Sequence, residues 1–208
     1  MKKKCVFVLF LTAFFMLNAT NVNIFGGVGS SIFTGDVDDD IQGKVCFGIG
    51  GSVDVQAGGF IIEPGIRFYS GGSKYEESEY STFNGVVITD YEYKETFTLN
   101  YLDIFAKAKF PVGSFMPYIG LGMPTLLSAT GKAEESNFGK GTSVSIDLKK
   151  SFTSTNFNLM LGADFVLLEK FIIGLEYSRS LNNILSDEDA GVVNLNNFML
   201  NVGFKLGI

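Results

Sequence analysis

The sequence contains no histidine and no tryptophan, and only two cysteines and four prolines among its 208 residues. Without histidine the chain lacks the commonest general base and the commonest metal ligand, so neither a Ser-His-Asp triad nor a Cys-His pair can form within it. Two cysteines are too few for a zinc site or a disulfide-dense scaffold. The 22 acidic residues outnumber the 16 basic ones, which argues against a nucleic-acid partner because that function needs a basic surface. We therefore expect no catalytic residue, no metal and no cofactor.

Glycine and phenylalanine are abundant instead. The chain has 25 glycines and 21 phenylalanines, and 46% of its residues are hydrophobic. This combination is unusual for a soluble enzyme, while the length suits one domain of moderate size or a single barrel. The arrangement of these residues along the chain indicates which of these two architectures is present.

The beginning of the chain has the layout of a secretory signal peptide. Residues 2–4 are all lysine, a short apolar run covers residues 5–17, and Ala19 supplies a small residue at the expected cleavage site. The apolar run is too short to span about 30 Å of hydrocarbon, so a transmembrane anchor is the weaker interpretation. We expect residues 1–19 to be removed on export and residues 20–208 to form the mature barrel domain.

After the signal peptide, apolar and polar residues alternate in eight segments. The last segment shows the pattern most clearly: between Phe198 and Ile208 every even position is large and apolar, whereas the odd positions are Asn, Met, Gly or Lys. Alternation with a period of two predicts β-strands with two chemically different faces. The eight segments are residues 22–32, 45–56, 60–69, 101–110, 115–124, 156–165, 171–180 and 196–208.

The connections between these segments alternate in length. Short connections fall at 57–59, 111–114 and 168–170, and long polar ones fall at about 35–43, 71–96, 129–152 and 182–194. Short turns at one end of an even number of strands, with long loops at the other end, are typical of an outer-membrane barrel. We therefore predict an all-β fold, an eight-stranded antiparallel up-and-down transmembrane β-barrel.

The chemistry of the two faces distinguishes two kinds of barrel. A soluble barrel such as a lipocalin carries its apolar face inward. An eight-stranded barrel is just wide enough inside for side chains, so small and paired charged residues suit the lumen and large apolar residues suit lipid. We assign the apolar face outward. A secreted soluble ligand-binding barrel remains the alternative.

Nine ionisable residues fall on the face assigned to the lumen. They are Asp54, Glu63, Arg67, Asp103, Lys107, Lys109, Asp164, Glu176 and Lys205. Isolated charges are costly in a narrow lumen, so we expect them to pair. The favoured interpretation is an ion-pair network that plugs the lumen and fixes the register of the strands. A proton or ion path gated by the same residues is the alternative.

A set of phenylalanines on the outward face lies nearest the short turns. They are Phe60, Phe110, Phe115, Phe165, Phe171 and Phe204. Aromatic side chains at one level of a barrel predict a girdle at the lipid–water interface. The ordinary preference of phenylalanine for strands is the alternative explanation, but the clustering at strand ends favours a girdle.

These segments resemble the small outer-membrane β-barrel family, which includes the OmpA- and OmpX-like and "porin family" eight-stranded barrels. The matching stretches are FIIEPGIRF from residue 60, NYLDIFAKAKF from residue 100, MPYIGLG from residue 116, and the region from residue 156 that ends LEKFIIGLEYSRSLNNI. The resemblance implies a bacterial outer-membrane location, contact with outer-membrane lipids and recognition of the C-terminal strand by the barrel-assembly machinery. Enzymes on this scaffold depend on a histidine general base, so the resemblance implies a non-enzymatic member here.

Two of the long connections are rich in acidic residues. Residues 36–40 contain four aspartates, and residues 187–189 are all acidic. An EF-hand loop beginning at Asp36 would need glycine at position 41 and glutamate at position 47, where this chain has Ile41 and Phe47. A solvated acidic rim is the expected structure.

The two longest connections are the expected site of any binding function. Loops as long as 71–96 and 129–152 are usually functional or disordered. The Val-Val-Ile run at 86–88 predicts a hairpin that extends above the membrane and offers strand edges to a protein partner. We therefore expect a structural or surface-interaction role through long extracellular loops. Passage of small solutes through a narrow channel is the runner-up.

Overall fold

The computed structural model describes residues 19–38, 40–83, 86–137, 140–187, 189 and 191–207. The predicted signal peptide lies outside these ranges apart from Ala19, which begins the first strand. No helix in the described ranges is long and apolar enough to cross a membrane.

The described residues form nine strands and one short 3-10 helix, η1 (Lys149–Ser151). The strands are β1 (Ala19–Gly35), β2 (Ile41–Ala57), β3 (Phe60–Phe83), β4 (Val86–Lys109), β5 (Phe115–Asn137), β6 (Lys140–Asp147), β7 (Asn158–Leu167), β8 (Phe171–Ser180) and β9 (Val193–Gly207). All neighbouring strands pair antiparallel.

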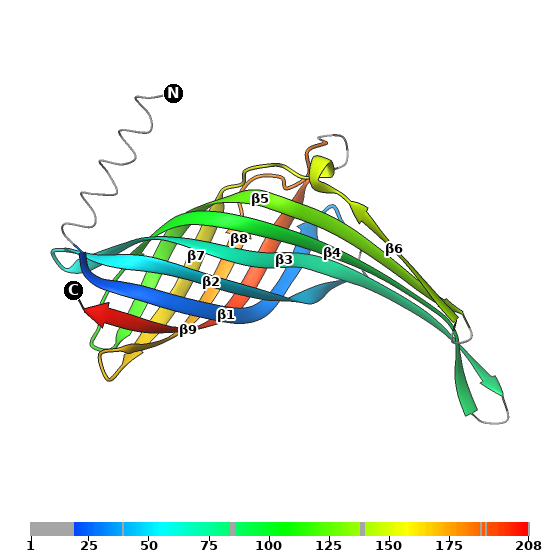
Figure 1. The fold of residues 1–208 in the computed structure, drawn as a ribbon, viewed down its shortest axis with the longest axis horizontal. Coiled ribbons are helices and arrows are strands. Elements are labelled where there is room, and N and C mark those ends of the chain that lie inside the picture. The colour runs from blue at the N-terminus through cyan, green and yellow to red at the C-terminus, as the bar shows by residue number, and fades with distance from the viewer. Residues whose placement is uncertain are drawn as a thin grey trace.

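Eight of these strands close into a ring. Their order around the ring is β1–β2–β3–β4–β5–β7–β8–β9, and β9 pairs back onto β1. The predicted eight-stranded antiparallel up-and-down β-barrel is therefore confirmed, and Figure 1 shows the ring with its strands tilted across it. Strand β6 is additional, because its described pairing is with the far half of β5, outside the ring.

Three strands are much longer than the ring requires. β3 and β4 each have 24 residues and β5 has 23, whereas β7 and β8 have 10. The extra length, together with β6, forms a four-stranded sheet that projects from one end of the barrel (Figure 1). We call this part the protruding sheet.

The protruding sheet corrects the prediction that 71–96 and 129–152 are long loops. The predicted extension of the 71–96 hairpin is present, since β3 and β4 pair as far as Phe83 and Val86. The region 129–152 is also largely strand, because β5 continues to Asn137 and β6 returns beside it. Strand β6 was not predicted, because neither face of the protruding sheet meets lipid and its strands need not alternate between apolar and polar residues.

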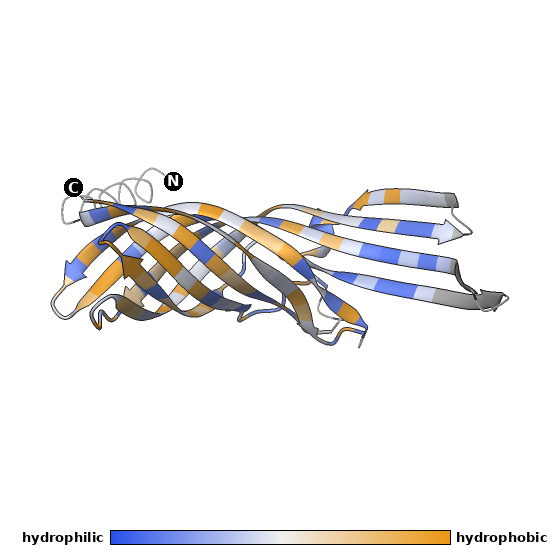
Figure 2. Cartoon of the chain, turned by 90° about the horizontal axis from the view of Figure 1, so that it is seen from below, coloured by the Kyte–Doolittle hydropathy of each residue, from blue (hydrophilic) through white to orange (hydrophobic). Residues whose placement is uncertain are grey.

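The two faces of the ring differ as the alternation predicted. On β8 the residues are exposed and buried in turn from Phe171 to Ser180. Large apolar side chains are exposed on the outer face of the barrel. In Figure 2 hydrophobic positions are frequent along the barrel strands, whereas the protruding sheet is coloured mostly as hydrophilic or neutral. Val53 and Val55 differ from this pattern: their positions belong to the outward set, but both are buried.

Tight turns join the strands at the end opposite the protruding sheet. Gly58 and Gly113 adopt the left-handed conformation in two of these turns, with φ of +65° and +64°. In the turn between β7 and β8, Leu168 and Glu169 adopt it as well, with φ of 51° and 61°. A type I′ hairpin turn requires two consecutive residues with positive φ. Residues other than glycine adopt positive φ at a cost in conformational energy.

Candidate functional site: the lumen and its mouth

The largest charged group in the lumen is centred on Glu176 of β8. The Arg67 guanidinium of β3 pairs with one of its carboxylate oxygens, and Lys107 Nζ of β4 lies 2.8 Å from the other. Tyr118 donates a hydrogen bond of 3.0 Å to the Lys107-paired oxygen. Arg67 Nε also lies 3.0 Å from Asp103 Oδ2. Two cations and two carboxylates thus neutralise one another inside the ring.

A second group joins β3, β4 and β7. Lys109 Nζ lies 2.5 Å from Asp164 Oδ2 and also pairs with the carboxylate of Glu63. Since one cation here serves two carboxylates, this group has an excess of negative charge. All three side chains are at most 7% exposed, so water screens their charges little.

The third group joins the first and last parts of the ring. Lys205 Nζ of β9 lies 2.8 Å from Asp54 Oδ2 of β2, and Asn23 Nδ2 of β1 donates a 2.8 Å hydrogen bond to the other oxygen. The structure thus brings all nine sequence-selected ionisable residues onto the inner face and places each in an ion pair.

These side chains fill the lower half of the lumen. The cavity beside Glu63, Lys107, Lys109 and Asp164 has a volume of about 20 Å³. Such a void holds one water molecule at most. Arg67 is also stacked between two rings, with its Cζ 5.2 Å from the Tyr69 centroid and 5.6 Å from that of Phe105.

Above the charged groups an apolar cluster occupies the lumen. Its buried members are Phe33, Tyr69, Leu99, Tyr101, Leu126, Ala129, Phe152, Ile184, Val193 and Leu195. Tyr69 and Tyr101 form its lower layer as a stacked pair with ring centroids 5.2 Å apart. Phe152 and Ile184 come from the connections after β6 and β8 rather than from the ring strands. The lumen is therefore packed at two levels of different chemistry.

Sequence reasoning missed the residues that pack in from these connections. Phe152 and Ile184 lie outside the alternating segments, so period-2 alternation could not identify them. The only signal was the presence of isolated large apolar residues within otherwise polar connections. Backbone hydrogen bonds fix both connections: Thr153 N donates to Ile184 O over 2.8 Å, and Ile184 N donates to Val193 O over 2.9 Å.

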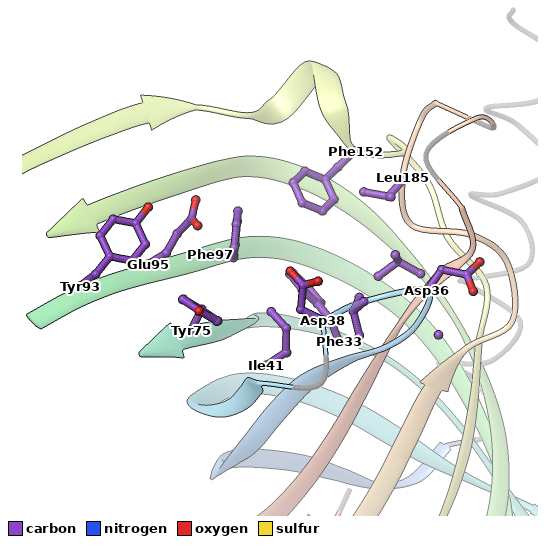
Figure 3. Close-up of a pocket in the computed structure, with 13 residues that line it drawn as sticks. Phe33, Asp36, Asp38, Ile41, Tyr75, Tyr93, Glu95, Phe97, Phe152 and Leu185 are labelled. Carbon is purple, nitrogen blue, oxygen red and sulfur yellow. The ribbon is translucent and has the colours of Figure 1, made fainter. Parts of the chain in front are cut away.

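A pocket of about 710 Å³ opens above the apolar cluster, at the foot of the protruding sheet (Figure 3). Phe33, Phe97 and Phe152 line its base. Tyr75, Tyr93 and Glu95 line it on the sheet side, and Asp36, Val37, Asp38 and Ile41 line it on the side of the connection between β1 and β2. No lysine or arginine is among the described residues that line it.

A family model for the outer membrane protein beta-barrel domain matches residues 6–205. The chain belongs to this family. It is therefore a bacterial outer-membrane β-barrel protein whose apolar outer face contacts membrane lipids. The alternative of a secreted soluble barrel is wrong.

The chain is similar to several solved structures of barrels, each at low sequence identity. The attachment invasion locus protein Ail of Yersinia pestis, solved with the heparin analogue sucrose octasulfate, is 17% identical with a TM-score of 0.46, over 90% of this chain and 99% of that one. Neisserial surface protein A is 11% identical with a TM-score of 0.45, over 90% and 97%. The Escherichia coli outer membrane protease OmpT is 8% identical with a TM-score of 0.40, over 90% and 97%. No curated protein sequence matches the chain.

Family membership orients the molecule in the membrane. Outer-membrane barrels have short turns on the periplasmic side and longer connections outside the cell. We therefore expect the turns at Gly58, Gly113 and Leu168 on the periplasmic side, and the protruding sheet and the pocket at its foot outside the cell.

The six phenylalanines selected from the sequence lie near the periplasmic rim on the outer face. All are between 36% and 48% exposed. Two pairs of these rings are in contact. Phe60, the first residue of β3, and Phe110, just after β4, have ring centroids 6.3 Å apart, and Phe171 of β8 and Phe204 of β9 have centroids 5.3 Å apart. Phe115 and Phe165 are directly opposed across β5 and β7.

The acidic connections do not form a metal site in the described part of the chain. No three side chains of the metal-binding types come together there. Asp36 instead accepts a 2.8 Å hydrogen bond from Val192 N, which ties the β1–β2 connection to the start of β9.

Proposed function

We propose that this protein is a non-enzymatic outer-membrane barrel that keeps its own lumen closed and presents the protruding sheet to a protein partner outside the cell. The protruding sheet is the observation that carries this proposal. A strand needs about 9–11 residues to cross the bilayer. β3, β4 and β5 are each more than twice that length.

The sheet offers an open edge at β6. In the described residues β6 pairs with β5 alone, so its other side has free backbone donors and acceptors. Val144 and Ile146 on this strand are 62% and 52% exposed. An exposed edge with apolar side chains is a template for the addition of a partner strand.

The packing of the lumen supports a scaffold rather than an enzyme or a channel. The nine lumen ionisable groups are engaged in ion pairs, and the chain has no histidine to act as a general base. A narrow channel, the alternative function, would need a water-filled path past the Glu176 group and the apolar cluster. The charged groups act in this proposal as a plug that fixes strand register, and the six phenylalanines act as the lower interfacial girdle.

Assembly into the membrane is a further part of the proposal. β9 pairs with β8 on one side and β1 on the other, so it closes the ring. We propose that this C-terminal strand is the segment that the barrel-assembly machinery recognises, after a signal peptide over residues 1–19 has directed export.

Truncation of the protruding sheet tests the proposed function. Residues 76–94 are replaced by an Asn-Gly turn, which joins the directly paired Tyr75 and Glu95. We expect this variant to keep its heat-modifiable migration on gels, because the ring is untouched. We also expect it to lose partner contact on intact cells, because the β5–β6 hairpin then loses its pairing with β4 between Glu134 and Asn137. Contact is measured by a photo-crosslinking residue at Val144, with the periplasmic turn position Val112 as control. A partner adduct that persists after truncation, or no adduct at Val144 on any cell surface tested, would overturn the proposal.

A further inference from the structure

The two faces of the protruding sheet differ in charge. The face that continues the outer surface of the barrel carries Lys74, Lys94 and Lys132 together with Glu76, Glu92 and Glu134. These residues pair with one another: Lys74 with Glu76 at 3.1 Å, Lys94 with Glu92 at 2.8 Å and with Glu76 at 3.7 Å, and Lys132 with Glu134 at 2.7 Å. Three cations balance three carboxylates, so these ion pairs carry no net charge.

On the opposite face, which continues the lumen surface, the carboxylates are not balanced by cations in this way. The strand register arranges it in three rungs across β3, β4, β5 and β6, namely Ser73–Phe97–Gly131–Ile146, Tyr75–Glu95–Ala133–Val144 and Glu77–Tyr93–Glu135–Thr142. Three carboxylates, three aromatic rings and two aliphatic side chains lie here, and none of these twelve positions is lysine or arginine. We call this surface the inner face of the sheet.

The inner face leads directly into the extracellular pocket. Tyr75, Tyr93, Glu95 and Phe97 belong to both, as Figure 3 shows, and Asp38 on the β1–β2 connection lies opposite them. The Tyr75 and Tyr93 rings meet edge to face with centroids 6.3 Å apart, which leaves ring surface available for a cation. A volume of about 710 Å³ is sufficient for several side chains of a ligand.

The electrostatics of this region are consistently negative. The pKa of the Tyr75 phenol is raised, first by desolvation and then by the carboxylate of Glu77, with smaller contributions from Asp40 and Asp38. Tyr75 donates a 3.2 Å hydrogen bond to Glu77 Oε2, which holds that carboxylate over the inner face, and no lysine or arginine side chain that the structure describes pairs with it. Anionic partners such as lipopolysaccharide are repelled by such a surface, whereas cationic ones are attracted.

We propose that the inner face and its pocket bind a basic polypeptide segment of a partner protein. Lysine or arginine side chains would meet Glu77, Glu95 and Glu135 and the rings of Tyr75 and Tyr93, while apolar side chains would enter the pocket over Phe97. Four strands about 4.8 Å apart give a surface wider than a small cation can cover, so the occupant is a chain with several side chains engaged at once. This inference rests on the proposed function and specifies the chemistry of the partner.

A pair of matched variants tests the inference, because β3, β4 and β5 each carry a glutamate on either face. The triple variant Glu77→Gln, Glu95→Gln, Glu135→Gln removes three charges from the inner face. The triple variant Glu76→Gln, Glu92→Gln, Glu134→Gln removes three charges from the outer face of the same strands. Heat-modifiable migration checks that both variants are folded.

Binding is measured with the full-length protein in nanodiscs of zwitterionic lipid, using a fluorescent peptide of alternating arginine and leucine. We expect the wild type and the outer-face variant to bind this peptide, and the inner-face variant to bind it at least about tenfold more weakly. A peptide of alternating glutamate and leucine should not bind. Tyr93→Leu should also weaken binding, since it removes one cation–π surface.

Several results would overturn the inference. They are the absence of binding to the wild type, an equal loss in both triple variants, and no loss in the inner-face variant. Spermine that binds as tightly as the peptide would point to a small polycation instead. If any of these results is found while a partner still crosslinks at Val144, the basic-segment inference fails and the proposed function stands. Absence of the Val144 crosslink in the untruncated protein is the failure of the proposed function.

Discussion

The guanidinium of Arg67 on β3 pairs across the lumen with the carboxylate of Glu176 on β8. In the order of the ring these two strands are separated by four positions in either direction, so the pair spans the barrel between directly opposite walls. Neither side chain is more than 4% exposed. Each ion is thus compensated by the other and by its neighbours rather than by water.

Removing one partner of this pair should destabilise the barrel strongly. Arg67→Met leaves Glu176 with Lys107 alone and leaves Asp103 without its cation. We expect the free energy of unfolding to fall by about 3–5 kcal/mol, as for other buried pairs that lose one member. Urea-induced unfolding in lipid vesicles, followed by heat-modifiable migration, measures this change. The double variant Arg67→Met, Glu176→Leu should lose clearly less than the sum of the two single losses, and simple additivity would contradict the coupling.

The outward assignment of the apolar face leads to a second prediction. Leu200 near the middle of β9 and Val144 on β6 are both apolar and exposed, at 44% and 62%, but only Leu200 faces lipid. Leu200→Arg should lower the free energy of unfolding by about 2–4 kcal/mol because the charge is placed in hydrocarbon. Val144→Arg should change it by less than about 0.5 kcal/mol, as surface substitutions do. Equal effects in vesicle unfolding would show that the barrel face is not in lipid.

The ion pairs on the outer face of the protruding sheet predict a pH dependence. The pKa of Glu76 is lowered, chiefly by its hydrogen bond from Lys74, so its contribution to local stability is present above its usual value of 4.5 and is lost as pH falls through the lowered pKa. The pKa of Lys94 is raised, chiefly by its hydrogen bond to Glu92, so its contribution is lost only as pH rises above 10.5 through the raised pKa. The sheet should therefore keep its amide protection throughout the neutral range.

An NMR titration of the Glu76 carboxyl tests the cause of this shift. In Lys74→Met the Glu76 titration midpoint should move upward, toward 4.5, because the principal hydrogen-bond donor is gone. Lys132→Met is the control, since Lys132 pairs with Glu134 and not with Glu76. A midpoint that does not move in Lys74→Met, or moves equally in both variants, would contradict the assignment.

The β7–β8 turn predicts a stabilising substitution. Leu168 and Glu169 adopt positive φ, and Lys170 N donates to Leu167 O over 3.1 Å to close the turn. Replacing Leu168-Glu169 by Asn-Gly should raise the free energy of unfolding by about 1 kcal/mol, because these residues adopt the left-handed region at low cost. Gly58→Ala, at a φ of +65°, should have the opposite effect. No difference between the two variants in vesicle unfolding would argue against this conformation.

The ring could be predicted from the sequence because the two faces of every ring strand lie in different environments, lipid on one side and the lumen on the other. Lipid favours apolar residues such as Leu200 and Val202 on the outer face, and a narrow lumen favours Asn201 and Gly203 on the inner face. Apolar and polar or small residues therefore alternate along the sequence with a period of two. The same reasoning placed all nine lumen ionisable residues on one face. It could not show that Arg67 meets Glu176, because their strands are far apart in sequence and only ring closure brings them together.

Strand β6 of the protruding sheet and the apolar cluster were not predicted, for two different reasons. Both faces of β6 are outside the membrane, so its residues need not alternate in hydrophobicity. Phe152 and Ile184 reach the lumen from connections whose path is set by tertiary hydrogen bonds rather than by a repeating pattern. The composition of the inner face could not be predicted from the sequence, because it depends on the strand register that places Tyr75 beside Glu95 and Tyr93 beside Glu135.

The central claim is that the barrel is a closed scaffold for an extracellular surface, and planar-bilayer recording of the purified protein tests it most directly. The ion pairs around Glu176 and the apolar cluster above them should leave no continuous water path through the ring. The predicted result is therefore the absence of any large, steady pore. Stable open-channel conductance in the nanosiemens range would contradict the account and favour a channel.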